Sequence, residues 1–177
     1  NMSGIIGQNT GRGTGLIKAA GGGGEIGQVL NVIQTAAISS NATSWADMTG
    51  LTLAITPSAT SSKILWNYNL MTGVNGDYGH VKIVYGDGSD LTTTAIGDAY
   101  ETRTSATSGG LYHASTGEEN HISMQGLYSP NTPAATTYKL QWFVASGYMY
   151  LNRGVYDPNA AGSDRNISTL TLTEILA

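Results

Sequence analysis

Residues 51–70 read LTLAITPSATSSKILWNYNL and hold two alternating segments with turn residues between them. In the first segment every second side chain is apolar, at Leu51, Leu53 and Ile55. Pro57 ends it, because proline has no N–H to donate to a β-ladder. The second segment has the same pattern, at Ile64, Trp66, Tyr68 and Leu70. Strand side chains alternate between two faces, so both segments are predicted strands with one buried face.

The same period of two continues in both directions from this pair. Further predicted strands contain residues 29–33, 81–85, 122–124, 138–144, 148–150 and 170–172. No segment has a sustained helical period, and the one cap-like stretch, residues 44–47, is followed at once by Met48-Thr49-Gly50. The predicted fold class is therefore all-β, an antiparallel jelly-roll sandwich of about 8–10 strands.

Residues 1–24 differ in composition from the rest of the chain. They are rich in glycine, and the period of two begins only at Glu25. Their spacing does not fit a phosphate-binding loop, because Lys18 is followed by Ala19 rather than by Ser or Thr. We expect an extended N-terminal anchoring arm with a glycine hinge over residues 1–24 and a head domain over residues 25–177. The anchoring side chains would be Ile5, Ile6, Leu16 and Ile17; the alternative is a leader with no role.

The composition excludes several classes of function. Charged residues make up 11% of the chain, the net charge is -4, and cysteine is absent. This charge offers no basic surface for nucleic acid, and without cysteine neither disulfides nor thiol chemistry are available. No apolar stretch approaches the roughly 20 residues that span a bilayer, and the N-terminus lacks the layout of a signal peptide. We therefore expect no nucleic-acid partner and no membrane insertion.

No motif for catalysis or for a cofactor stands out. The three histidines, His80, His113 and His121, have no metal-ligand spacing, and no nucleophile motif accompanies them. The stretch GDGSD, residues 86–90, offers two carboxylates but lacks the ladder of a calcium loop, so a tight hairpin turn is the favoured interpretation. We expect a protein that is not an enzyme and that carries neither a cofactor nor a metal.

The first and last predicted strands are apolar at alternate and at intervening positions. A strand that is apolar on both faces is covered on both faces, most simply by another subunit. Candidates for this interface are Val29, Leu30, Val32, Leu170, Leu172 and Ile175.

The middle of the chain, residues 91–119, is rich in Thr, Ser and Gly and has weak periodicity. Loops at the ends of a sandwich often carry binding groups, and aromatic side chains there suit recognition of a glycan or receptor. Candidate contacts are Trp45, Tyr100, Arg103, Tyr112 and His113. Ordinary solvated loops are at least as compatible with this composition.

Two stretches resemble a group of bacteriophage virion proteins. Residues 136–177 read TTYKLQWFVASGYMYLNRGVYDPNAAGSDRNISTLTLTEILA, and residues 27–73 read GQVLNVIQTAAISSNATSWADMTGLTLAITPSATSSKILWNYNLMTG. The first is similar to the closing strands of that domain and the second to its opening strands. Residues 91–119 depart most from the family pattern.

The resemblance implies a trimeric jelly roll akin to the globular heads of complement and tumour-necrosis-factor proteins. It implies a structural protein on the outside of a virion, as a head decoration, head fibre or tail-fibre tip, assembled in the host cytoplasm with other capsid or tail proteins. The alternative function is a carbohydrate- or receptor-binding module that acts in host adsorption.

Overall fold

The computed structural model describes residues 24–91, 95–112, 119–161 and 163–176. These residues form ten β-strands and no helix. The strands are β1 (Glu25–Gln34), β2 (Ile38–Ser40), β3 (Ala46–Ile55), β4 (Lys63–Asn75), β5 (Gly79–Tyr85), β6 (Ser108–Leu111), β7 (Asn120–Tyr128), β8 (Thr136–Val144), β9 (Tyr148–Leu151) and β10 (Ser168–Leu176). The predicted all-β class is confirmed: the strands pair antiparallel in two sheets that form a sandwich.

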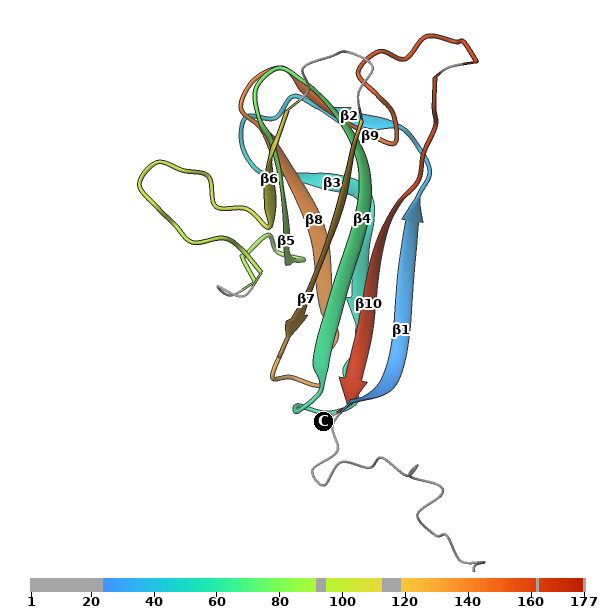
Figure 1. The fold of residues 1–177 in the computed structure, drawn as a ribbon. Coiled ribbons are helices and arrows are strands. Elements are labelled where there is room, and N and C mark those ends of the chain that lie inside the picture. Colours follow the sequence, from blue (N-terminus) through green and yellow to red (C-terminus); the bar gives the residue numbers. More distant parts are fainter. Residues whose placement is uncertain (1–23, 92–94, 113–118, 162, 177) are drawn as a thin grey trace, which may run out of the picture.

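Sheet A contains β1, β10, β4 and β7, which lie side by side in Figure 1. Its central strand, β4, is long enough to pair with two strands in succession. β10 pairs with β4 from Lys63 to Asn69, and β9 pairs with it from Thr72 to Asn75. In the same way β1 pairs with β10 and β2 pairs with β9. Sheet B has the order β3-β8-β5-β6.

The core lies between the two sheets and follows the predicted alternation. Ile64, Trp66, Tyr68 and Leu70 of β4 face Tyr138, Leu140, Trp142 and Val144 of β8 across the sandwich, and all eight are buried. Burying each such side chain contributes about 1.5–3 kcal/mol relative to leaving it exposed. The faces of these two strands are thus fixed by the apolar pattern, because a slip of one residue would expose every one of them.

The structure differs from the sequence expectation in three respects. The strand expected to begin near Leu51 begins at Ala46 and includes part of the cap-like stretch. β2 and β6 are short strands that were not predicted, since neither contains three alternating apolar residues. Part of residues 91–119 is core rather than loop surface, because Leu91 and Ala95 are buried.

The interface expected from the last strand is wrong for two residues. Leu170 and Leu172 are 0% exposed in the single chain and pack in the core. The positions that alternate with them, Thr169, Thr171 and Thr173, face outward, so β10 is not apolar on both faces. Leu30 and Val32 of β1 also pack against the core.

Asn152 is fully buried where sheet A changes from the β1–β10 pair to the β2–β9 pair. Its side chain and backbone bind residues on both sides of this change. Its amide group donates to the carbonyl oxygens of Gln34 and Ala36, between β1 and β2, at 2.8 and 3.0 Å. Its side-chain oxygen accepts from the Ser168 hydroxyl at 2.6 Å, and its N–H donates to the Met71 carbonyl at 2.8 Å. Its φ of +62° is left-handed, a conformation that asparagine tolerates better than most residues.

Replacing Asn152 with aspartate is expected to destabilise the fold by about 3 kcal/mol, because a buried carboxylate would face two carbonyl oxygens without a donor. Urea unfolding at pH 7 measures the change. The control Asn131→Asp alters an exposed asparagine that has a similar left-handed φ of +54°, and its unfolding midpoint should stay close to that of the parent. Equal midpoints for the two variants would contradict the role of Asn152.

Glu174 forms hydrogen bonds at the end of sheet A where β1 begins and β10 ends, away from Asn152. Its side chain is 1% exposed and accepts hydrogen bonds from Ser58 N (2.6 Å), Ser58 Oγ (2.7 Å) and Gln28 Nε2 (2.9 Å). Burial by itself would raise the pKa of this carboxyl, but the hydrogen bonds from Ser58 and Gln28 outweigh burial and lower the pKa to about 2. The carboxylate thus ties β10 to β1 and to the β3–β4 connection.

The lowered pKa of Glu174 predicts an acid-sensitive contribution to stability. It is fully present above the ordinary pKa of 4.5 and is lost as the pH falls toward 2, since the unfolded chain binds the proton more readily. Glu174→Gln should therefore be less stable at pH 7, by about 2 kcal/mol, and should approach the parent between pH 4.5 and 2. Urea midpoints across this range test it, with the exposed Glu25→Gln as control. A constant difference between parent and Glu174→Gln would refute the assignment.

Candidate functional site

No metal-binding cluster appears in the described parts of the chain. No three His, Asp or Glu side chains there come together as metal ligands. The GDGSD stretch forms the predicted tight turn, in which Asp87 Oδ1 accepts from Ser89 N at 2.9 Å and Gly88 has a φ of +90°. Hydrogen bonds from Ser89 lower the pKa of Asp87, so the carboxylate serves the turn itself. Nor does any helix within the described ranges have the length and apolarity to cross a bilayer.

Five aromatic side chains gather on the outer face of sheet B, near the β4–β5 turn; we call them the aromatic strip. His80 of β5 lies beside Phe143 of β8, with ring centroids 5.5 Å apart, and Phe143 lies 5.8 Å from Trp45. Tyr78 precedes β5 and lies 6.0 Å from Tyr112, which follows β6. Tyr78 and Tyr112 are the most open members, 56% and 57% exposed.

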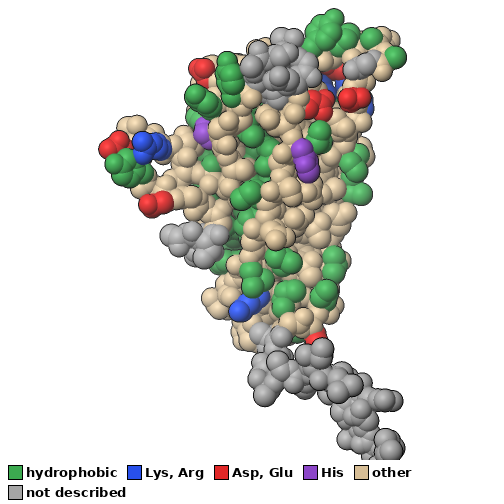
Figure 2. All heavy atoms as spheres, in the orientation of Figure 1, with side chains coloured by type: hydrophobic (Ala, Val, Ile, Leu, Met, Phe, Trp, Pro, Cys, Tyr) green, Lys and Arg blue, Asp and Glu red, His purple; other side chains and the backbone are tan. Residues whose placement is uncertain are grey.

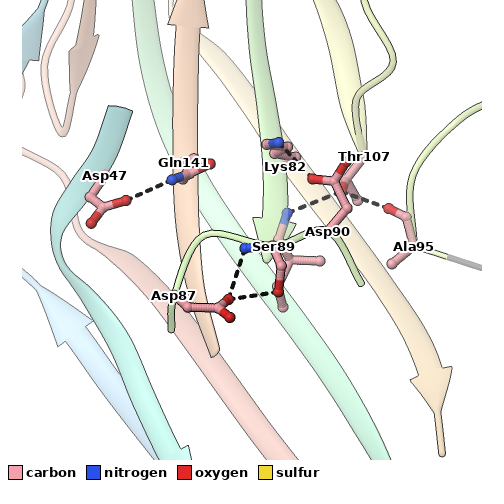
Figure 3. Close-up of polar contacts among 9 residues, drawn as sticks. Asp47, Lys82, Asp87, Ser89, Asp90, Ala95, Thr107 and Gln141 are labelled. Atoms are coloured by element: carbon pink, nitrogen blue, oxygen red, sulfur yellow. Dashed lines mark hydrogen bonds and ion pairs between the residues drawn. The ribbon is translucent and has the colours of Figure 1, made fainter. Parts of the chain in front are cut away.

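A row of paired charges lies on the same face as the aromatic strip, and Figure 3 shows Asp47, Gln141, Lys82 and Asp90 of this row. Asp47 of β3 accepts from Gln141 Nε2 and from Lys139 Nζ, both at 2.8 Å, and these hydrogen bonds lower its pKa. Lys82 Nζ lies 2.6 Å from Asp90 Oδ1 and 4.6 Å from the ring centroid of Trp45. The row therefore brings two cations and two carboxylates into two ion pairs beside the rings.

The imidazole of His80 is fixed beneath β6. A Cβ added at Gly109 would lie 2.4 Å from His80 Nδ1, so the histidine occupies space that only glycine leaves open. Burial lowers the pKa of His80 below its ordinary value of 6.5, because desolvation disfavours the charged ring. His80 is therefore neutral at pH 7 and acts in the strip as an uncharged ring.

A second group of rings and charges lies where β9 leads into the loop before β10. Tyr148 and Tyr150 stack with centroids 6.1 Å apart, and the Arg153 guanidinium lies 4.0 Å from the Tyr150 centroid. Asp157 pairs with Arg153 at 3.3 Å and also with Arg165. The hydrogen bond from Arg165 lowers the pKa of Asp157. An open pocket of about 540 Å³ adjoins this loop, lined among others by Met71, Tyr156 and Asp164.

The outer face of sheet A is almost without charge. Lys63 is the one Lys, Arg, Asp or Glu among its outward positions on β1, β10, β4 and β7. Figure 2 shows charged side chains mainly at the ends and on a side loop rather than over the middle of this face. Apolar side chains lie toward both edges: Ile26, Val29 and Ile33 on β1, and Leu65, Met71 and Leu127 on β4 and β7. Between them runs a stripe of Thr169, Thr171, Thr173, Asn67 and Asn69.

The structure brings some of the predicted contact residues together and separates others. Trp45 and Tyr112 belong to the aromatic strip. Tyr100 and Arg103 stack on each other, 4.6 Å from guanidinium to ring centroid, in the loop that precedes β6. His113 lies outside the described residues, as do the arm residues Ile5, Ile6, Leu16 and Ile17. Of the interface candidates, Val29 and Ile175 lie on the outer face of sheet A.

The sequence interpretation missed Tyr78, His80 and Phe143 as site residues. A signal was present, because Tyr78, His80 and Lys82 alternate with the core residues Val81 and Ile83 and so share the outer face. Phe143 likewise alternates with Trp142 and Val144. What the sequence did not provide was the pairing of β5 with β8, which places His80 opposite Phe143.

The chain matches no model of a known protein family. A comparison with curated proteins also finds no significant relative.

Proposed function

We propose that the chain is a non-enzymatic structural protein of a bacteriophage virion, displayed on the particle surface as a trimer and attached through its N-terminal arm. The observation that carries the proposal is the difference between the two outer faces of the sandwich. Sheet B carries two Asp–Lys pairs whose carboxylates are exposed, whereas the outward strand positions of sheet A carry Thr, Asn, Ser, Gln, His121 and aliphatic side chains, with Lys63 as the one Lys, Arg, Asp or Glu among them. A solvated face of an antiparallel sheet is normally polar, but the outer face of sheet A leaves Ile26, Val29 and Ile33 at one edge and Leu127 at the other 50–64% exposed, so we expect a neighbour to cover it.

The arrangement on sheet A favours a second copy of the chain as the cover. The β1 edge and the β4–β7 edge carry different apolar groups, separated by the Thr and Asn stripe. When one apolar edge meets the other edge of a neighbour, the contact is heterologous, and such contacts generate a closed ring if the rotation closes. A ring of three agrees with the family that the sequence resembles.

The strand order supports the jelly-roll assignment. If β2 and β9 are taken as extensions of β1 and β10, eight strands remain, four in each sheet. From β3 to β5 and from β6 to β8 the chain crosses between the sheets at each step, as expected for the two-sheet, eight-stranded jelly roll. Placement on a virion rests on the resemblance of residues 27–73 and 136–177.

Aspartate in place of Val29, which is 56% exposed in the single chain, should leave the fold intact and break the trimer. A carboxylate buried without a partner costs several kcal/mol, so subunit affinity should fall by about three orders of magnitude or more. Sedimentation velocity at micromolar concentration measures the mass. Thr52→Asp, on an outward position of sheet B near Lys139, is the matched control and should remain trimeric. A parent protein that sediments as an 18.4 kDa monomer would overturn the proposed assembly.

The arm is tested by replacing Ile5, Ile6, Leu16 and Ile17 with serine in the full chain. The first strand of the sandwich begins at Glu25, so the variant should keep its trimeric mass but lose attachment to particles of the encoding phage that lack the native protein. Three arms bind together, so losing all their anchors should abolish attachment rather than weaken it slightly. Co-sedimentation with such particles is the measurement. Full occupancy by the serine variant would place the anchor in the head domain.

A further inference from the structure

We propose that the aromatic strip on sheet B is a binding site for a neutral oligosaccharide. Tyr78, Tyr112, His80, Phe143 and Trp45 form this strip on a face that the proposed trimer leaves free. The site itself requires only the single chain, whereas its presentation in three copies rests on the proposed function.

The rings point to a ligand that has flat apolar faces. Neighbouring centroids within the Tyr78–Tyr112 pair and the His80–Phe143–Trp45 row are 5.5–6.0 Å apart. Two of the rings are held within a sheet, since His80 and Phe143 are paired residues of β5 and β8, and the other three lie one residue from a strand end. Aromatic side chains held on a rigid sheet lose little conformational entropy on binding. A pyranose offers such faces through its C–H groups, and its hydroxyls remain free at the edge.

Polar groups for those hydroxyls lie next to the rings. The exposed carboxylate of Asp47 is held in place by Lys139 and Gln141, and an oxygen held in this way still has lone pairs to accept from a hydroxyl. The row Asp47–Gln141–Lys82 crosses β3, β8 and β5 immediately beside Trp45 and Phe143. The face thus combines a few oriented polar groups with aromatic surface, the usual composition of a small-ligand site.

The charges favour a neutral sugar over an acidic one. Both lysines of the row are in ion pairs, Lys82 with Asp90 and Lys139 with Asp47, so binding an anion would require breaking one of these pairs. His80 is held neutral by burial, and Asp77, next to Tyr78, adds a negative charge. A carboxylated or sulfated glycan would meet repulsion without a free cation to offset it.

The strip also lies at the end of the molecule where a ligand is most accessible. β4 runs from Lys63, beside the end of β10, to Asn75, beside the start of β9, a distance of about 40 Å at 3.3 Å per residue. The head domain begins at the Lys63 end, where Glu25 pairs with Leu176 (Figure 1). Tyr78 and Tyr112 lie near the opposite end, so an arm attached to a particle would hold the strip outward.

The test uses the full-length protein on an array of neutral oligosaccharides built from glucose, galactose, mannose and N-acetylglucosamine, with matched sialylated and uronic-acid members. We expect binding to neutral members only. Titration calorimetry with the best neutral oligosaccharide should show a loss of at least about tenfold in affinity for each of Tyr78→Ala and Tyr112→Ala. Both side chains are more than half exposed, so neither substitution should disturb the fold.

The matched control is Tyr156→Ala, which removes a tyrosine that is 67% exposed in the loop before β10 and should bind like the parent. Absence of binding to every neutral member, binding only to acidic members, or unchanged affinity in both strip variants would each overturn the proposal. Sedimentation of the same samples separates the two proposals: a monomer that binds the neutral oligosaccharide upholds the strip and refutes the trimer. A trimer that binds none of the neutral oligosaccharides upholds the trimer and refutes the strip.

Discussion

The sandwich depends on the hydrogen bonds of one buried amide, the side chain of Asn152. Near this residue β1 gives way to β2 and β9 gives way to β10, so backbone groups that a continuous ladder would pair are left without strand partners. Asn152 donates to two of these carbonyls, Gln34 and Ala36, and accepts from Ser168. Buried polar groups in proteins normally have hydrogen-bond partners. The side chain of Asn152 supplies partners for the Gln34 and Ala36 carbonyls where sheet A changes strands. These hydrogen bonds join the β2–β9 pair, which carries Tyr148 and Tyr150, to the β1–β10 pair.

The outer faces of the two sheets differ in how many charged side chains they carry. Charged residues make up only 11% of the chain, so charge cannot cover both faces. Among outward strand positions, sheet A carries only Lys63, whereas sheet B carries Asp47, Lys82 and Lys139, which form two ion pairs, one of them with Asp90, beside the aromatic strip. Each pair joins a largely buried lysine to an exposed carboxylate, so the pair neutralises the lysine and orients the polar groups of that face. Sheet A, left with threonine, asparagine and aliphatic side chains, is the face suited to a protein neighbour.

The all-β class and most strands could be predicted from the sequence because one physical signal, burial of alternate side chains, is local. It placed Ile64, Trp66, Tyr68 and Leu70 correctly in the core. The same signal was misread for the last strand, where Ile175 beside Leu170 and Leu172 suggested two apolar faces, although the threonines that alternate with the leucines mark the outward face. The aromatic strip could not be predicted from local alternation, because His80 meets Phe143 only through the pairing of β5 with β8, which is a long-range contact. Local alternation assigns a side chain to a face, but only topology decides which side chains on that face become neighbours.

The two proposed functions, attachment and glycan binding, are placed at opposite ends of the molecule. At one end Glu174 binds Ser58 and Gln28, which fixes β1 where it emerges next to the end of β10. At the other end the β4–β5 turn is held against the β8–β9 turn, where a Cβ at Gly147 would overlap the Asn75 carbonyl and Ser146 binds Asp77. In the proposed attachment a force would reach β1 and β10 first, and these strands are held by a buried carboxylate and by pairing from Glu25 to Gln34 with one irregularity between Ile26 and Val29. The aromatic strip belongs to the other sheet and the other end, so attachment and recognition need not share any residue.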